Sequence, residues 1–305
     1  MVQVVLRRVA HAGLVLWGVS TIVFMLTHLS GDPTNLMLPP DATFEERVEF
    51  SERLGFNRPL IVQYGDFLGD AAVLDFGDSL RFDQPAMEIV WERVPATLEL
   101  TTAAMALAVL VAVPLGALAA THRGSWIDSI SLVTAIGGQS LPVFWLGLML
   151  ILGFSETLHW LPSGGRGGFD HLILPAFTLS VLAMAMIMRI TRSAMLDVLG
   201  ADYVRTARAK GLRERIITYR HVARNAAIPV VTIAGLALGL MLGGAVITET
   251  VFAWPGIGRL VIQAISNRDF PVVQAYVFLI AIVIVVLNLL VDFLYIWINP
   301  QVRIN

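Results

Sequence analysis

Six long stretches without a charged residue constrain the fold of this chain more than any other feature. An α-helix rises 1.5 Å per residue, so about 20 apolar residues cross the roughly 30 Å hydrocarbon core of a bilayer. Strands of a membrane barrel would be about 10 residues long and would alternate polar and apolar residues, a pattern that is missing here. The sequence therefore predicts six spanning helices, over residues 9–29, 100–120, 129–155, 172–188, 226–248 and 270–291.

The composition agrees with a chain that lies largely in lipid and carries no chemistry of its own. It is 56% hydrophobic and 14% charged, whereas soluble domains hold about 25% charged residues. The absence of cysteine excludes disulfides, thiolate metal sites and a cysteine nucleophile. The histidines show no metal-ligand spacing, and the single lysine, Lys210, is not part of a phosphate-binding loop. We expect no enzyme activity, no metal and no bound cofactor, and any ATP would be hydrolysed by another chain.

The first stretch has two interpretations, a signal peptide or a retained membrane anchor. Arg7 and Arg8 precede it, as in a signal peptide, but the apolar run is longer than such a segment needs. We therefore favour the anchor. With the N-terminus inside, the arginines gather in the inside loops, above all between the fourth and fifth stretches. An even number of crossings then leaves both termini in the cytoplasm.

Charge divides the chain into three regions. They are a cytoplasmic N-terminus with the first span at 1–29, an acidic extracytoplasmic cap at 30–96, and a transmembrane core at 97–305 with a cytoplasmic loop at about 189–227. In the cap, Thr43 and Glu46 have the spacing of a capping box, and a second helix is expected to start at Pro59. The cap is either a passive cover over the outer mouth or a docking surface for an external partner.

The cytoplasmic loop has the pattern of two short amphipathic helices separated by a glycine. Apolar residues recur at helical spacing on both sides of Gly211, at i, i+3, i+7 and i+11 as Leu196, Leu199, Tyr203 and Ala207, and at i, i+4, i+7 and i+11 as Leu212, Ile216, Tyr219 and Ala223. We expect Gly211 to close the first helix at positive φ. The resulting hairpin either lies on anionic headgroups, which the pattern alone slightly favours, or presents a rigid face to a cytoplasmic protein.

Polar and small residues inside the spans predict where helices meet other helices or a pore. Pro142 predicts a kink in the third span, and Gln139 with Ser140 supplies polar groups that lipid cannot satisfy. These side chains either pack against another helix or line a translocation path. Glycines at every fourth position of the fifth span predict a close approach of a second helix, within the chain or across a dimer: Gly235, Gly239 and Gly243. Glu249, after this span, is expected at the outer water boundary.

At the hairpin, the chain resembles a known family. The segment Ala201-Asp202-Tyr203-Val204-Arg205-Thr206-Ala207-Arg208-Ala209-Lys210-Gly211-Leu212 is similar to the EAA-type coupling loop of ATP-binding-cassette (ABC) importer permeases. It most resembles the B-type subunit of the dipeptide/oligopeptide/nickel branch. Arg205-Thr206-Ala207 stands where the wider superfamily has E-A-A, and His221-Val222-Ala223-Arg224 stands in place of I-x-L-P, a departure typical of this branch.

The resemblance extends along the whole chain in an ordered series of motifs. They are the segments 30–33, 54–55, 58–60, 63–64, 76–79, 93–100, 140–145 and 161–165, and Glu249-Thr250-Val251-Phe252-Ala253-Trp254-Pro255-Gly256-Ile257-Gly258-Arg259-Leu260 after the fifth span. The last of these is near-diagnostic. Together they imply an all-α membrane protein of the type I ABC importer permease fold, with six transmembrane helices and a small helical extracytoplasmic segment between the first two.

The resemblance also implies a function and a set of partners. The chain would form half of the translocation path for di- or oligopeptides in a bacterial or archaeal inner membrane. Its partners would be a second, homologous permease, two ATPase subunits that hold ATP and Mg, an extracytoplasmic solute-binding protein and membrane lipid, with no nucleic acid. Nickel chelates, glutathione or oligosaccharides are alternative substrates, and a stand-alone secondary transporter or a membrane scaffold is the alternative class.

The resemblance assigns two groups of site residues. The ATPase-coupling residues would be Asp202, Tyr203, Arg205, Thr206, Ala207, Arg208, Ala209, Lys210, Gly211 and Leu212. The binding-protein docking residues would be Glu249, Trp254, Pro255, Gly256 and Arg259. The translocation path, inferred from the polar residues of the third span, would involve Gln139, Ser140 and Pro142.

Overall fold

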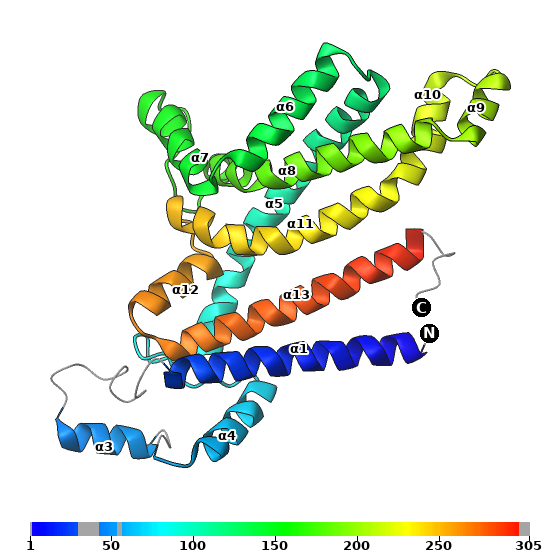
Figure 1. Ribbon diagram of the computed structural model, residues 1–305. Helices are drawn as coiled ribbons and strands as arrows, with labels where there is room; N and C mark the ends of the chain where they lie inside the picture. The colour runs from blue at the N-terminus through cyan, green and yellow to red at the C-terminus, as the bar shows by residue number, and fades with distance from the viewer. Residues whose placement is uncertain (1, 30–42, 54–56, 299–305) are drawn as a thin grey trace. The chain divides into compact units, whose positions relative to one another are not determined.

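The structure is a computed structural model that describes residues 2–29, 43–53 and 57–298. Over these residues the secondary structure is helical, and the β-structure is limited to an isolated bridge between Asp78 and Pro85. The chain folds into two compact units (Figure 1). Unit 1 comprises Met1–Pro95 and Arg259–Val286, and unit 2 comprises Ala96–Gly258 and Leu287–Asn305. The all-α prediction is confirmed for the described residues.

Unit 1 contains the extracytoplasmic segment that the sequence predicts to be a cap. Its helices are α1 (Val2–Leu29), α3 (Phe44–Arg53), α4 (Leu60–Ala72), the start of α5 (Ala86–Thr121), most of α12 (Ile257–Ser266) and the first part of α13 (Phe270–Ile298). The capping box of α3 is confirmed, since the Thr43 N–H donates to Glu46 Oε2 at 2.8 Å and the Glu46 N–H donates to Thr43 Oγ1 at 3.3 Å. Helix α4 begins at Leu60 with Pro59 as its N-cap, one residue after the predicted start.

Aromatic side chains hold α4 to α1 and the following loop to α13. The Phe24 and Tyr64 rings lie 5.2 Å apart, and Thr21 Oγ1 lies 2.6 Å from the Tyr64 hydroxyl. Phe76 lies in the loop that follows α4, and its ring is 5.4 Å from that of Phe278. Packing between a membrane-length helix and the helices of the cap gives α4 a fixed place within unit 1. The motif at residues 30–33 lies outside the described residues.

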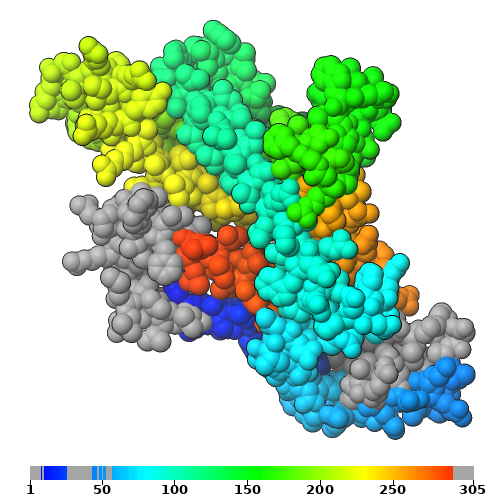
Figure 2. All heavy atoms as spheres, turned by 180° about the vertical axis from the view of Figure 1, so that it is seen from behind, coloured from blue at the N-terminus to red at the C-terminus, as the bar shows by residue number. Residues whose placement is uncertain are grey.

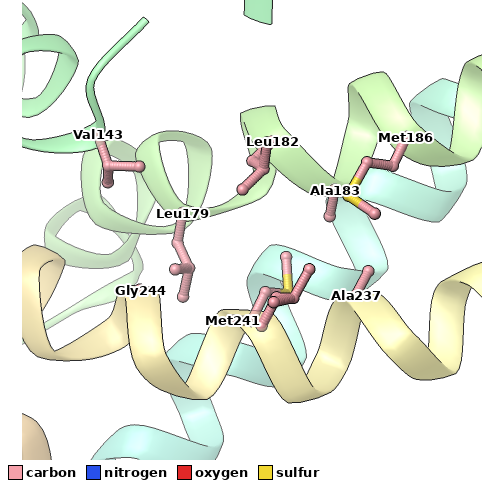
Figure 3. Close-up of a pocket in the computed structure, with 9 residues that line it drawn as sticks. Val143, Leu179, Leu182, Ala183, Met186, Ala237, Met241 and Gly244 are labelled. Atoms are coloured by element: carbon pink, nitrogen blue, oxygen red, sulfur yellow. The ribbon is translucent and has the colours of Figure 1, made fainter. Parts of the chain in front are cut away.

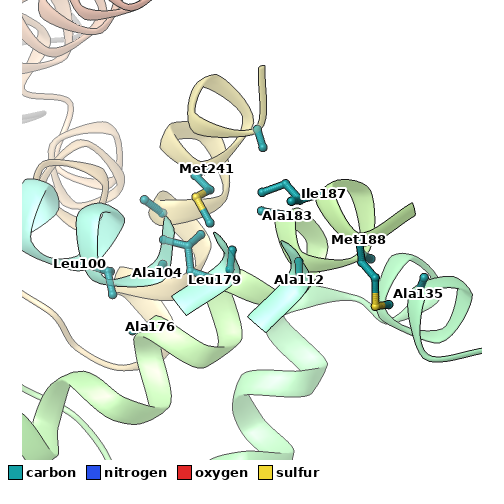
Figure 4. Packing of buried hydrophobic residues seen from close by; sticks show 14 of the residues in the cluster. Leu100, Ala104, Ala112, Ala135, Ala176, Leu179, Ala183, Ile187, Met188 and Met241 are labelled. Carbon is teal, nitrogen blue, oxygen red and sulfur yellow. The ribbon is translucent and has the colours of Figure 1, made fainter. Parts of the chain in front are cut away.

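Unit 2 is built around α5, α8 and α11, which pack through small residues. Its helices are the rest of α5, α6 (Trp126–Ser140), α7 (Val143–Leu150) with the π-helix Ile151–Thr157, α8 (Phe169–Leu199), α9 (Asp202–Ala209), α10 (Glu214–Ile216), the π-helix Ile217–Val222 and α11 (Ala223–Val251). The buried core between them is dominated by alanines (Figure 4). Because alanine and glycine let helix backbones approach closely, this composition suits helix packing in lipid. At Gly116 of α5, an added Cβ would lie 2.7 Å from the carbonyl oxygen of Met188.

Among the described residues, four helices are long and apolar enough to cross a membrane, and they correspond to the predicted second, fourth, fifth and sixth spans. Their extents are Ala86–Thr121, Phe169–Leu199, Glu214–Val251 and Phe270–Leu290. The first predicted span lies in α1, whose described apolar part is Ala10–Met25. The helices outrun the predicted apolar runs because charged residues end such a run without ending a helix. The total of six spans stays a prediction.

The third predicted span is not the single kinked helix that the sequence suggests. Helices α6 and α7 meet at 103°. Leu141 is extended with φ −82° and ψ 127°, and Pro142 follows with φ −62° and ψ 129°. The proline ring disfavours the helical conformation in the residue before it, and proline has no N–H to continue the helix. Two successive extended residues therefore break the helix, whereas Pro175 of α8 is accommodated without a break.

The glycine seam of the fifth span does not make the close approach within this chain. A Cβ added at Gly239 or Gly243 would meet nothing within 4 Å among the described residues. The contact with α8 is made instead by the neighbouring Gly244, where a Cβ would lie 3.3 Å from Leu179 Cδ1. Of the two meanings that the sequence leaves open, close packing within the chain is therefore not observed at these two glycines.

Candidate functional site

The hairpin formed by residues 202–225 has one buried face and one exposed face. Val204 and Ala207 of α9 are buried together with Ile217 and Val222 of the following π-helix, against residues of α5, α8 and α11. The hairpin lies at the end of α8 and α11 opposite α7 (Figure 1) and projects from unit 2 (Figure 2). This packing holds α9 against the helices of unit 2 and leaves the other face of α9 exposed.

The buried positions of the hairpin differ from the apolar faces expected from the sequence. Val204 is buried, whereas Tyr203 is 46% exposed and Tyr219 is 72% exposed. Helix α8 ends at Leu199 and α9 begins at Asp202, so the helical period does not continue from one to the other. In the second half of the hairpin, the i→i+5 hydrogen bonds of the π-helix shift the buried face by one residue from the face expected for an α-helix.

Gly211 ends α9 in the predicted way. Its φ is 76°, in the left-handed region that favours glycine. The Gly211 N–H donates to the carbonyl oxygen of Arg208 at 2.9 Å, and the Leu212 N–H donates to that of Ala207 at 3.3 Å. These two bonds define a Schellman motif, which satisfies the last carbonyl groups of the helix. The turn at Gly211 is therefore a defined structure with fixed hydrogen bonds.

Polar contacts brace the exposed side of the hairpin. Arg208 Nε donates to Glu214 Oε1 at 2.7 Å across the turn, and this carboxylate raises the pKa of Arg208. Asn225 Nδ2 donates to the Tyr203 hydroxyl at 2.9 Å, joining α9 to the start of α11. Arg205 lies 3.6 Å from Asp202. Among the predicted coupling residues only Ala207 is buried, while the rest are exposed: Asp202, Tyr203, Arg205, Thr206, Arg208, Ala209, Lys210, Gly211 and Leu212.

The predicted translocation-path residues lie at the break between α6 and α7. Gln139, Ser140 and Pro142 are exposed in this chain. Ser140 Oγ donates to the carbonyl oxygen of Ile136 at 2.9 Å, which satisfies its hydroxyl within its own helix. The polar tip of α6 is therefore exposed on unit 2, and its role in a translocation path stays a prediction.

Two cavities in unit 2 are apolar. One of about 30 Å³, bordered by α7, α8 and α11, is lined by apolar side chains and a glycine, among them Val143, Leu179 and Met241 (Figure 3). We interpret it as a packing defect, because no polar side chain lines it. A larger cavity of about 450 Å³ lies between α5, α8 and the Thr218–Val231 part of the chain, beside the base of the hairpin. Its few polar side chains include Thr121 and Tyr219.

The loop that follows α11 is folded over a buried carboxylate. Glu249 has an exposed fraction of 0%, so the expectation that it lies at the water boundary is wrong. Thr97 Oγ1 donates to Glu249 Oε1 at 2.5 Å, and the Gly258 N–H donates to Glu249 Oε2 at 2.8 Å. The Ile257 N–H in turn donates to Thr97 Oγ1 at 2.9 Å. The Glu249 carboxylate, which precedes the loop, thus binds Gly258 at the end of the loop and Thr97 of α5 through hydrogen bonds.

Other residues of the same loop also face the interior. Trp254 is 1% exposed, and its Nε1 donates to the carbonyl oxygen of Ala96 at 2.8 Å. At Gly256, an added Cβ would overlap the Glu249 carboxylate. Pro255 and Arg259 are partly exposed. Glu249, Trp254 and Gly256 therefore shape the loop from inside, and its docking role stays a prediction.

One functional candidate was not found from the sequence, the ion pair between Asp128 and Arg192. Arg192 Nε donates to Asp128 Oδ1 at 2.5 Å, and Arg192 Nη2 donates to Asp128 Oδ2 at 2.9 Å. The two side chains are 21% and 6% exposed, for arginine and aspartate respectively. They lie 64 residues apart in the sequence, so no local pattern joins them. The sequence signal for this pair is that Asp128 and Arg192 each lie at the edge of an apolar stretch.

Comparison with solved structures shows the class of fold. The methionine ABC transporter MetNI in inward-facing conformations includes a chain that matches with a TM-score of 0.58 and 21% identity, covering 70% of this chain and 97% of that chain. An amino acid ABC transporter crystallised with histidines matches with a TM-score of 0.53 and 17% identity, covering 68% and 93%. The fold is that of a type I ABC importer permease.

The chain belongs to the family of binding-protein-dependent transport system inner membrane components, whose model matches residues 112–304. The dipeptide transport system permease protein DppB of Alkalihalophilus pseudofirmus is 40% identical over 332 residues, covering 99% of this chain and 100% of the relative. The glutathione transport system permease protein GsiC of Escherichia coli is 40% identical over 304 residues, covering 99% of each. The chain is therefore a multi-pass inner membrane permease subunit of an ABC importer, in which separate subunits hydrolyse ATP.

Proposed function

We propose that the exposed face of α9 is the surface by which this permease is driven, docking against a cytoplasmic ATPase subunit. The observation that carries the proposal is the polarity of that face. A helix that lies on a membrane surface must keep its apolar side for lipid. Here the apolar side, with Val204 and Ala207, is already buried in unit 2. The uncovered side carries Asp202, Arg205 and Thr206, which suit a protein surface better than headgroups.

The charge around the two arginines of α9 supports the same choice. A surface for anionic lipid gains from unpaired basic residues. Arg208 is instead paired with Glu214 at 2.7 Å, and Arg205 lies near Asp202. The turn at Gly211 and the bond from Asn225 to Tyr203 keep this mixed-charge surface in one shape. A shaped surface with both signs of charge is what recognition by a specific protein requires.

For the substrate, we propose small peptides delivered by an extracytoplasmic binding protein. The support is the function of the two relatives, since one is a dipeptide permease and the other a glutathione permease. Glutathione, nickel chelates and oligosaccharides remain alternative cargo. A second permease would complete the path at the exposed break that holds Gln139 and Ser140. Both termini would lie in the cytoplasm, on the same side as the hairpin.

The proposal is tested by reconstitution into proteoliposomes with a second permease, the ATPase subunits and the binding protein. Uptake of a labelled dipeptide should require ATP and the binding protein, and competition with glutathione and with a nickel chelate should rank the substrates. Two results would contradict the proposal. Transport by this chain without any ATPase subunit would identify a secondary transporter, and a complex whose ATPase responds to no binding protein would identify a scaffold.

A further inference from the structure

Near the start of α6, the partly buried ion pair between Asp128 and Arg192 joins this helix to α8. Asp128 also accepts the Gly124 N–H at 3.0 Å, so its carboxylate has protein donors on both oxygens. Ser125 caps α6 by accepting the Asp128 N–H at 3.4 Å. Two parallel bonds from one guanidinium fix the orientation as well as the distance of the two helices. At this point α6 can neither slide nor turn on α8 without breaking the pair.

The other end of α6 is seated on α8 by close packing. A Cβ added at Gly138 would lie 3.1 Å from Val181 Cγ1 and 3.5 Å from the Ala185 Cβ. Ala135, one turn earlier, is 3% exposed in the same core cluster as Ala185 and Met188. Gly138 follows Asp128 by about 15 Å of helix, at 1.5 Å per residue. Helix α6 is therefore held to α8 at both ends.

The two joined helices carry the two candidate sites at their opposite tips. Beyond Arg192, α8 continues for about two turns and reaches α9 through Gly200 and Ala201. Ala194 and Met195 of that last part of α8 pack with Val204 and Ala207 of α9. At the other tip, α6 ends at Ser140, beside Gln139 and the break at Pro142.

We propose that Asp128 and Arg192 are positioning residues for transport, because their ion pair makes α6 and α8 one rigid arm between the coupling helix and the polar break. A displacement imposed on α9 would then move Gln139 and Ser140 together with α8. Packed helices and short ion pairs transmit such displacements because they have discrete arrangements and do not deform continuously. The inference rests on the proposed function, since it needs a force applied at α9.

The first test compares uptake with ATP hydrolysis in the reconstituted complex for Asp128→Asn, Arg192→Gln and the swap Asp128→Arg/Arg192→Asp. We expect each single variant to keep binding-protein-stimulated ATP hydrolysis while uptake per ATP falls by about five- to tenfold, within the usual range of coupling between sites. The swap should recover part of the loss. Ser129→Ala is the matched control, because Ser129 is exposed on α6 and its hydroxyl bonds only to the Ser125 carbonyl.

The outcomes separate this inference from the proposed function. A wild-type complex that does not couple ATP to uptake would overturn the proposed function and the inference with it. A wild-type complex that transports, with single variants that keep the wild-type ratio of uptake to ATP, would overturn the inference alone. An equal loss of uptake and ATP hydrolysis would also overturn it, because that result indicates a role in stability only.

A second test does not depend on variants of the ion pair. The chain has no cysteine, so cysteines placed at the exposed Ser129 of α6 and Ser193 of α8 can carry its spin labels, in a complex whose other subunits have had their cysteines replaced. The distance between the labels should be the same without nucleotide and with the ATPases trapped closed, while a label pair between Ser129 and an ATPase subunit changes. A change within the Ser129–Ser193 pair between these states would overturn the rigid arm.

Discussion

At the scale of single residues, the acidic side chains Asp128 and Glu249 show how this apolar chain uses buried charge. Each is nearly inaccessible, and each has donors on both carboxylate oxygens. An ionised carboxylate without such partners would be very costly away from water. Sequence reasoning could see both residues at the edges of apolar stretches. It could not see the donors, because they come from segments distant in the chain, such as Arg192 and Thr97.

Thr97 should be more important for stability than the threonine one turn later. Thr97→Val removes the hydrogen bond that Glu249 Oε1 accepts and the one that the Ile257 N–H donates, and the loss of such a bond by a buried polar group costs about 1–3 kcal/mol. Thr101 is equally buried, but its hydroxyl bonds only within its own helix at 2.8 Å. We expect Thr97→Val to lower the thermal unfolding midpoint of the purified complex well below that of Thr101→Val. Equal midpoints would contradict the role given to Thr97.

Gly211 should be intolerant of any side chain. Its φ of 76° costs a residue with a Cβ about 1–2 kcal/mol, and the Schellman bonds then weaken. Gly211→Val should leave the chain in the membrane and reduce uptake more than ATP hydrolysis. Gly69→Ala in α4 is the control, since an added Cβ there meets nothing within 4 Å. Normal uptake by Gly211→Val, measured beside this control, would argue against a fixed hairpin.

At the scale of elements, the capping box of α3 makes a prediction about pH. Hydrogen bonds from the Thr43 N–H and then the Thr43 hydroxyl hold the pKa of Glu46 below its ordinary 4.5. Because the folded value is the lower one, the stabilisation is present above pH 4.5 and is lost as the pH falls through the folded pKa. In Thr43→Val the pKa should rise toward the ordinary value, as a carboxyl-carbon NMR titration can measure. An unchanged pKa would mean that the side-chain bond is unimportant.

The break between α6 and α7 depends on Pro142 in a way that can be tested. Proline disfavours a helix interior by about 3 kcal/mol, so Pro142→Ala favours a continuous helix. We expect the 103° bend to open, with a longer distance between spin labels at Val133 on α6 and Met149 on α7. Pro175→Ala is the control because α8 is already continuous there. An unchanged label distance in Pro142→Ala would show that tertiary packing alone sets the bend.

Helix identity could be predicted from the sequence more reliably than helix direction or register. The apolar runs located the long helices, and the glycine located the turn of the hairpin. The extended pair Leu141–Pro142 and the π-helix Ile217–Val222 were not predicted, because proline also occurs inside continuous helices and a π-helix has no simple sequence pattern. The break between α8 and α9 was not predicted either, and it displaces the buried face of α9 from Tyr203 to Val204.

At the scale of the whole molecule, the fold class and family could be predicted, and the contacts that unite distant segments could not. Membrane helices are evident from composition because lipid requires continuous apolar helices. The ordered motifs then indicated a permease, which the family match confirms. The α6–α8 arm and the buried loop around Glu249 depend on pairs of residues far apart in sequence. A single amino-acid sequence contains no local pattern that identifies such pairs.

The central claim is that the exposed face of α9 contacts an ATPase subunit, and it is tested most directly by crosslinking. A photoreactive group at Arg205, on the exposed side of α9, should crosslink to an ATPase subunit in the assembled complex, and the same group at the exposed Asp66 of α4 should not. Crosslinks from Arg205 that reach only lipid, in a complex proven to contain the ATPase subunits, would contradict the account.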